Sequence, residues 1–447
     1  MEMASRNGGD KKSEAVIVTT ARNRRDSARE EEDVDGGWAW VVLVASFVVN
    51  SISLGSNFAF GVFLPEWVDY FGEGPTKTSM LISMSCALVL ATAPLASILS
   101  NRFGARSVIL VGGFLTSTGF AASYFAPNFW TLFFAYGIVT GLGNGLSYSP
   151  SFGVLPLYFR KRRNFATAIV TAGNGVGIVI FSALFRYLIT HYTWRGAMLI
   201  TAGIALHIVP CGLCVFKRQP RTVSTTFRET AALELFTEPE FYVSLLHSAL
   251  MGSQYIFIVF CVQYARLNNR LAPEDTALIL TSMGVTNIVG RTLVAVVSTV
   301  PALATSHKRF IYLSVMSLAV AVSISMYPLT KQTNLTTLCF LAGLVGLSWG
   351  TKFSLVPGIQ MDLLRPARFN VSWGYIAFVL GVAFFAFPPL ASEIAKATGN
   401  GDNAFYFAGA MSGLAFLTCP VLHFLWWRRR RAAAPAQVRK HSANGAP

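Results

Sequence analysis

The sequence predicts an all-α membrane protein with twelve transmembrane helices in two six-helix bundles. Of its 447 residues, 53% are hydrophobic and only 13% are charged, whereas soluble domains carry roughly one quarter charged residues. The apolar residues form continuous runs, such as residues 38–63 and 129–157, which are long enough to cross a hydrocarbon layer about 30 Å thick as helices. A polar stretch from Lys217 to Glu240 divides the runs into two equal sets.

Runs of about 20 apolar residues are interpreted as single crossings. The expected spans are residues 38–64, 78–100, 107–126, 129–156, 165–190, 195–216, 241–265, 275–299, 309–329, 335–360, 370–395 and 404–427. The resulting organisation is an N-terminal cytoplasmic tail (1–37), an N-terminal bundle (38–216), a cytoplasmic linker (217–240), a C-terminal bundle (241–427) and a C-terminal cytoplasmic tail (428–447). Both tails mix charges of either sign with few large apolar residues, which predicts disorder.

Basic residues are distributed unequally between the alternate loops that these spans define. If both termini are cytoplasmic, the inner loops carry fourteen Lys and Arg residues and the outer loops carry six. Lys and Arg accumulate on the cytoplasmic side of membrane proteins, so the count supports this orientation. Arg428 to Arg431 directly follow the last span, where they would meet anionic headgroups. Topology therefore explains the net charge of +15, and the expected partner is a lipid bilayer rather than a nucleic acid.

The sequence favours neither a metal site nor an enzyme. All six cysteines fall inside apolar runs, including Cys211 and Cys214, which are spaced as CxxC. Packing is a better interpretation of these residues than metal or redox chemistry. The spans contain no paired carboxylates, no HExxH motif and no Ser/His/Asp set of the kind that hydrolases use. We therefore expect no metal, no cofactor, no disulfide and no catalytic residue.

Three cations lie inside the predicted spans, beyond the first residue of each, although no helix centre carries an acid. They are Arg186, Arg291 and Lys352, and an unpaired cation inside a membrane costs at least about 2.5 kcal/mol. Arg291 lies about midway along its span, so we expect it to bind a substrate carboxylate in a central cavity. Asn287 lies four residues earlier and therefore on the same helix face. We expect it to be a second substrate contact. For Lys352 two interpretations stay open, a substrate contact or snorkelling to the interface. Arg186 is close to the outer end of its span, which favours a structural role.

Two longer motifs lie at the starts of the first and fifth spans. Residues 35–40 read DGGWAW, and residues 158–163 read YFRKRR. They resemble the two signatures of the monocarboxylate transporter family, a branch of the major facilitator superfamily. The matching residues are Asp35, Gly36, Gly37, Trp38 and Trp40 in the first motif and Tyr158, Phe159, Lys161, Arg162, Arg163 and Gly173 in the second. Physically, the Trp rings suit a helix start at the membrane interface, and the basic cluster suits an inner loop.

The resemblance implies the twelve-helix fold of that superfamily and a plasma-membrane transporter of a small organic carboxylate. The family's proton-coupled lactate carriers place an Asp four residues before the Arg of the eighth span and a Lys in the outer half of the first span. This chain has Asn287 at the first position and no Lys between Phe58 and Phe63. These departures favour facilitated transport of a small monocarboxylate or a carboxylate-bearing zwitterion.

Two alternatives stay open at this point. One is a proton-coupled lactate or pyruvate symporter that uses another titrating group. The other is a non-transporting sensor or receptor that keeps the transporter fold. The sequence also leaves open whether the chain needs a single-span ancillary glycoprotein for delivery to the cell surface, as some members of the family do.

Overall fold

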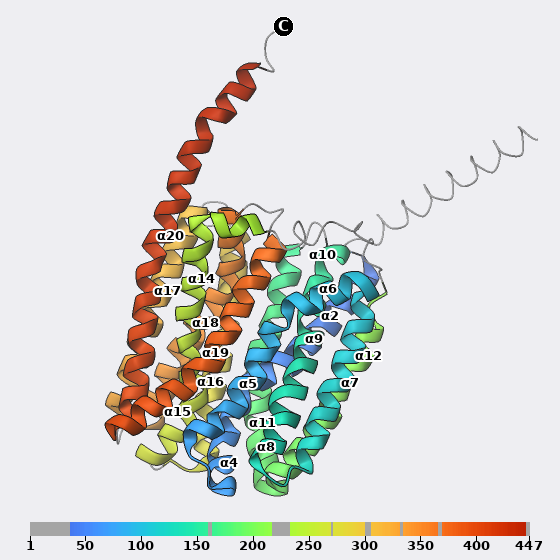
Figure 1. Cartoon of the computed structure of the whole chain (residues 1–447), viewed down its shortest axis with the longest axis vertical. Helices are drawn as coiled ribbons and strands as arrows, with labels where there is room; N and C mark the ends of the chain where they lie inside the picture. Colours follow the sequence, from blue (N-terminus) through green and yellow to red (C-terminus); the bar gives the residue numbers. More distant parts are fainter. Residues whose placement is uncertain are drawn as a thin grey trace, which may run out of the picture.

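The computed structural model describes residues 36–159, 163–216, 233–269, 271–299, 305–330, 334–364 and 369–443, and these residues form helices and no strand. The long helices lie side by side, approximately along the long axis of the molecule (Figure 1). The end at which the first helix begins and the last helix leaves the bundle is the end that the charge count predicts to be cytoplasmic. We call it the inner end, and we call the opposite end the outer end.

The N-terminal half opens with a long helical run whose hydrogen-bonding pattern changes along its length. Its segments are α2 (Gly37–Asn50), the π-helix η1 (Ser51–Gly55), α3 (Ser56–Ala59), the 3₁₀ segment η2 (Phe60–Phe63) and α4 (Leu64–Phe71). The rest of this half comprises α5 (Pro75–Ala91), α6 (Ala93–Phe103), α7 (Ala105–Tyr124), α8 (Phe129–Leu132), η3 (Phe133–Thr140), α9 (Gly141–Gly153), α10 (Leu155–Tyr158), α11 (Arg163–Leu206) and α12 (Ile208–Leu213).

The C-terminal half has longer uninterrupted helices. Its elements are η4 (Leu233–Thr237), α14 (Pro239–Met251), η5 (Gly252–Gln254), α15 (Tyr255–Asn268), α16 (Pro273–Thr299), α17 (Ser306–Met326), η6 (Tyr327–Thr330), α18 (Leu335–Leu364), α19 (Phe369–Thr398) and α20 (Asp402–Ala443). In a hydrocarbon solvent the backbone groups must be paired within each crossing, which is why these apolar runs form helices.

The described residues contain the twelve crossings that the sequence predicts. Ten helical runs are long and apolar enough to span a membrane, and α5 with α6 makes a further crossing that is bent by 40°. One of the ten, Ala166–Leu213, has 48 residues and would be about 72 Å long if it were straight. It is broken at Thr193, whose φ is 61°. Its two arms are therefore separate crossings, as the predicted spans 165–190 and 195–216 require.

Two boundaries differ from the sequence prediction. The first crossing continues through α4 to Phe71 and stops at Gly72, whose positive φ of 65° suits glycine. α20 continues as a helix to Ala443, past residue 428, where a disordered tail is predicted to begin, and the alanines at 432–434 favour this conformation. The predicted N-terminal tail falls outside the described residues up to residue 35, and the predicted linker does so from 217 to 232.

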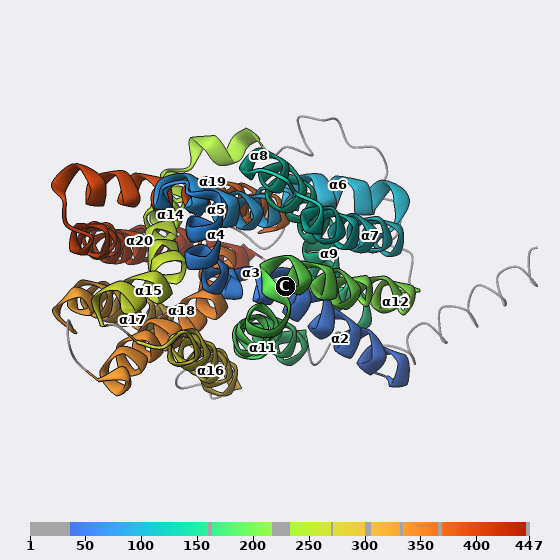
Figure 2. The same ribbon diagram turned by 90° about the horizontal axis from the view of Figure 1, so that it is seen from below.

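The two halves meet along two long helix pairs. α5 of the first half packs against α19 of the second, and α11 packs against α16, as the end-on view in Figure 2 shows. Buried apolar residues of both halves form one continuous core. A smaller core, which includes Phe241, Leu313 and Ile359, belongs to the C-terminal half alone.

Candidate functional site

Arg291 is buried at the interface between the two halves. It has eighteen residues of α16 before it and eight after it, so it lies nearer the inner end than the predicted midpoint. Its side chain is 2% exposed, and its Nε donates a hydrogen bond to Oδ1 of Asn287 at 2.8 Å. The guanidinium carbon lies 5.7 Å from the ring centre of Phe353 in α18, a cation–π contact. Arg291 and Asn287, which the four-residue spacing predicts to share a helix face, are therefore in contact.

The N-terminal half presents two polar residues to this pair. Tyr148 of α9 lies within electrostatic range of Arg291 and beside Asn174 of α11. Both polar atoms of the Asn174 side chain are buried and lack a hydrogen-bond partner in the described part of the chain. Buried amides are nearly always hydrogen-bonded, because an unsatisfied one costs free energy. Asn174 is thus available to a ligand that enters between the halves.

Glycine allows α11 and α16 to approach closely at this point. A Cβ atom on Gly175 would lie 2.7 Å from Cγ1 of Ile288 and 3.2 Å from Oδ1 of Asn287. Neither contact is possible without a shift, so a larger residue would separate the helices or displace Asn287. Farther toward the outer end, the hydroxyl groups of Ser182 and Thr281 are 2.8 Å apart and join the same two helices by a hydrogen bond.

The charge at this site is positive and has no acidic partner. Within the described ranges no carboxylate forms an ion pair with Arg291. Its Nε is engaged by Asn287, which leaves the terminal N–H groups for a ligand. A guanidinium binds a carboxylate through two parallel N–H···O bonds, and Asn174 and Tyr148 can supply further hydrogen bonds. The arrangement provides the donors and the positive charge that an anion would require.

Lys352 lies in a different environment. It is near the middle of α18, with seventeen residues before it and twelve after it, and it is fully buried. Its Nζ has no hydrogen-bond partner among the residues described. Its electrostatic neighbours are His247 of α14 and Cys419 of α20, both within the C-terminal half. Because the side chain is fully buried, the ammonium group does not snorkel to the interface in this conformation.

Arg186 has an acidic partner near the outer end of its span, although no centre of a predicted span carries an acid. Its Nη1 donates a hydrogen bond to Oε1 of Glu66 at 3.2 Å. Arg266 of the C-terminal half lies 3.4 Å from the same oxygen. The sequence did not reveal this partner, because Glu66 lies in the part of the first crossing beyond its predicted end. This ion-pair group joins the two halves at the outer end.

An aromatic cluster lies on the outer side of Arg291. Trp349 precedes Phe353 by one turn of α18 and packs against Phe58 of α3, with ring centres 4.7 Å apart, and against Phe384 of α19 at 6.2 Å. Tyr255 stacks on Phe384 at 4.5 Å. The cluster joins both halves and contains the buried Phe58, Tyr255 and Trp349. Together with the Glu66 ion pairs and the Ser182–Thr281 hydrogen bond, it closes the outer side of the site in this conformation.

The described parts of the two sequence motifs pack together at the inner end of the N-terminal half. The indole N–H of Trp38 donates to the carbonyl of Cys214 at 2.9 Å. The ring of Trp40 lies 5.7 Å from that of Phe159, and the hydroxyl of Tyr158 accepts a hydrogen bond from the backbone just after α12. These contacts connect α2, α10 and α12, away from Arg291. They indicate a structural role for the motifs.

The remaining motif residues are placed as follows. Gly36 and Gly37 form the start of α2. A Cβ atom on Gly173 would lie 2.7 Å from the carbonyl oxygen of Phe47, so this glycine lets α11 pack on α2. Arg163 is the first residue of α11. Asp35, Lys161 and Arg162 lie outside the described residues.

Sequence reasoning missed Tyr148 and Asn174 as members of the site. Uncharged polar residues are common in these spans, so neither residue stands out in the sequence. Asn174 could have been recognised from its position in an apolar run, because an amide inside a membrane span requires a hydrogen-bond partner. Gly175 lies between Gly173 and Gly177 in the sequence, a spacing of small residues that is typical of close helix packing.

Comparison with known proteins connects this chain with transporters. The profile of the Major Facilitator Superfamily matches residues 46–348. The chain is 32% identical to monocarboxylate transporter 6 of Homo sapiens over 84% of this chain and 78% of that protein. It is 31% identical to monocarboxylate transporter 3 of Rattus norvegicus over 85% and 79% of the two chains. Its 41% identity to monocarboxylate transporter 9 of Mus musculus extends over 46% of this chain and 40% of that relative.

Proposed function

Because this chain belongs to the Major Facilitator Superfamily and, within it, to the monocarboxylate transporter family, we propose that it is a plasma-membrane carrier of a small monocarboxylate or a carboxylate-bearing zwitterion. Its relatives are transporters rather than enzymes. The observation that carries the proposal is the environment of Arg291, a buried cation without an acid at the interface between the halves.

The proposed cargo follows from the charge at the site. Arg291 offers its free N–H groups to a carboxylate, while Asn174 and Tyr148 contact the same ligand from the other half. A site with cations and no acid attracts anions and repels simple cations. A zwitterion can also enter, provided that its ammonium group points away from Arg291.

The proposed mechanism is alternating access. The contacts that join the halves on the outer side of Arg291 include the Glu66 ion-pair group, hydrogen bonds such as Ser182–Thr281 and Thr76–Ser392, and the aromatic cluster. These contacts must separate for the site to open outward. Rocking of two rigid six-helix halves about a central site is the usual motion of this architecture. A ligand held by residues of both halves favours states in which the halves close around it.

For coupling, we propose facilitated transport. The residue one turn from Arg291 is Asn287, which is neutral at every relevant pH and accepts the Nε hydrogen bond. Protonation therefore cannot release Arg291 from this neighbour, as it could from an aspartate. The alternative is a symporter of protons with lactate or pyruvate, in which another group titrates. We further propose that both termini are cytoplasmic, and a single-span ancillary glycoprotein is a candidate partner for surface delivery.

The proposal is tested with the purified protein in liposomes. Labelled lactate, creatine, carnitine and an aromatic amino acid are offered at pH 6 and pH 8, with choline as a cationic control and protein-free liposomes as a blank. We expect saturable uptake of at least one carboxylate with similar rates at the two pH values and no uptake of choline. Strong acceleration by external acid would support the symporter instead. Binding of a carboxylate without any uptake would identify a sensor.

A further inference from the structure

A polar pocket lies at the inner end of the C-terminal half, remote in the fold from Arg291. It is lined by Ser306 of α17, Asp362 of α18, and Trp426, Arg429 and Arg430 of α20, and its volume is about 330 Å³. A single water needs only about 10–15 Å³ of such volume, so this space can admit the phosphate and the adjoining part of a lipid headgroup. We propose that it binds the headgroup of an anionic phospholipid from the adjacent leaflet.

The charges around the pocket leave one cation free for a ligand. Arg429 is engaged by Glu238 at 3.1 Å and by the carbonyl of Leu363. Asp362 forms an ion pair with Arg309 at 3.2 Å. Arg430, by contrast, pairs with no carboxylate among the described residues and rests over the ring of Trp426, 5.4 Å from its centre.

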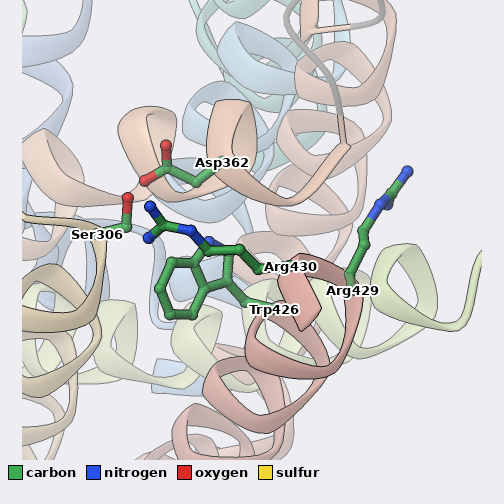
Figure 3. Close-up of a pocket in the computed structure, with 5 residues that line it drawn as sticks. All are labelled: Ser306, Asp362, Trp426, Arg429 and Arg430. Atoms are coloured by element: carbon green, nitrogen blue, oxygen red, sulfur yellow. The ribbon is translucent and has the colours of Figure 1, made fainter. Parts of the chain in front are cut away.

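Figure 3 shows how these side chains are directed. The guanidinium group of Arg430 points toward Ser306 and Asp362, whereas Arg429 extends to the other side of α20. A phosphate between Arg430 and Ser306 would receive a charge-assisted hydrogen bond and a hydroxyl hydrogen bond. The neighbouring carboxylate of Asp362 can accept a hydrogen bond from a donor on the same headgroup, such as the ammonium of phosphatidylserine. The pocket therefore suits a headgroup with both a phosphate and a donor.

The surroundings favour a lipid over a free phosphate ion. The pocket lies directly beyond the apolar part of α20, where Trp426 lines it and the run from Arg428 to Arg431 begins. Trp rings at a span end are typical of the headgroup region of a bilayer. A lipid whose headgroup occupies the pocket would have its acyl chains at the level of the apolar spans, whereas a free phosphate ion has no apolar part.

The test uses the full chain, purified in detergent and stripped of lipid, with phosphatidylserine titrated and the bound lipid counted by native mass spectrometry. Arg430→Gln removes the free cation of the pocket. Arg428→Gln removes the same charge from the same basic run, at a position that does not line the pocket. Melting temperatures of both variants check that they are folded.

We expect one phosphatidylserine to bind to the wild type and its affinity to fall at least about tenfold in Arg430→Gln. For Arg428→Gln we expect a loss of no more than about fivefold, the contribution of one basic residue near an anionic surface. Phosphatidylcholine, which lacks a donor on the headgroup, should bind more weakly. Equal losses in the two variants would overturn the proposal, because they would indicate nonspecific attraction by the basic run. Equal affinity for phosphatidylcholine, or for inorganic phosphate or glycerophosphoserine, would also overturn it.

Discussion

Arg291 and Lys352 are both buried cations of the C-terminal half, and their surroundings differ. Arg291 faces the N-terminal half, where the polar side chains of Tyr148 and Asn174 lie near it. Lys352 lies inside the C-terminal half, near His247 and Cys419. Neither has an acidic partner among the described residues. Burial of a cation in an apolar span is thus a weak indicator of a substrate site by itself, and a position between the two halves is the more specific one.

The difference has a mechanical reason. When two rigid halves rock against each other, the contacts between them change, while the contacts inside each half persist. The affinity for a ligand at Arg291 therefore differs between the conformations, and binding of the ligand shifts the equilibrium between them. A group at Lys352 keeps the same neighbours throughout the cycle. The expected effects of substitutions at and around the two residues follow from this distinction.

The largest expected effect is that of Arg291→Ala. Removing one partner of a buried, hydrogen-bonded charge pair typically costs 2 to 5 kcal/mol, so we expect kcat/KM for carboxylate uptake to fall at least about 30-fold. Arg291→Lys should recover only part of this loss, because an ammonium group cannot form the two parallel bonds of a guanidinium. Initial rates in liposomes measure both variants, and uptake with an unchanged KM in either would remove Arg291 from the binding site.

A second substitution, Asn287→Asp, places an acid one turn from Arg291. The Oδ1 to Nε distance of 2.8 Å would become an ion pair that competes with the substrate carboxylate. We expect uptake to fall about tenfold at pH 6 and pH 8 alike, because the adjacent guanidinium stabilises the charged aspartate over this range. Asn287→Ala is the control, since it removes the hydrogen bond without adding a charge, and its uptake should fall less. An Asn287→Asp variant that transports as fast as the wild type would contradict this description of the site.

The close approach of the two halves is tested by Gly175→Ala. The added methyl group would meet the side chains of Ile288 and Asn287 at 2.7 and 3.2 Å, so these side chains must shift or α11 and α16 must separate. We expect the maximal uptake rate to fall about fivefold, consistent with an overpacking cost of roughly 1 to 3 kcal/mol. Gly203→Ala is the matched control on the same helix, because its Cβ would have nothing within 4 Å. Equal rates for the two variants would show that tight contact at Gly175 is dispensable.

The smallest effect is expected for Lys352→Met. Methionine keeps the length and shape of the side chain, and Nζ has no hydrogen bond to lose among the described residues. Removing a buried, unpaired polar group is not destabilising. We therefore expect uptake within twofold of the wild type, roughly the scatter of a neutral substitution, and a melting temperature that does not decrease. A loss as large as that of Arg291→Ala would instead make Lys352 a substrate contact.

Much of the fold could be predicted from the sequence because hydrocarbon imposes a simple rule on the chain. A run of about 20 apolar residues must form a helix that crosses the membrane, and the predicted spans match the observed crossings closely. The break at Thr193 was predicted as a short gap between two spans. The extension of the first crossing to Phe71 was not, because Glu66 and Asp69 interrupt the apolar run.

The site could be predicted only in part. Arg291 and Asn287 are four residues apart on one helix, and helical periodicity alone places them together. Tyr148, Asn174 and Arg291 come from three helices, and no spacing in the sequence encodes their convergence. The Glu66–Arg186 pair, 120 residues apart in the chain, was missed for the same reason. Contacts within a helix follow from sequence, whereas contacts between helices depend on how the two halves pack.

The most direct test of the central claim compares a carboxylate substrate with its uncharged carboxamide analogue. Competition with labelled substrate in liposomes gives the relative affinity of the two compounds for the wild type and for Arg291→Met. If Arg291 reads the carboxylate, the wild type prefers the acid by at least about 30-fold, corresponding to 2 kcal/mol or more, and Arg291→Met loses nearly all of this preference. An Arg291→Met variant that transports and still prefers the carboxylate to the same extent would show that another group recognises the charge.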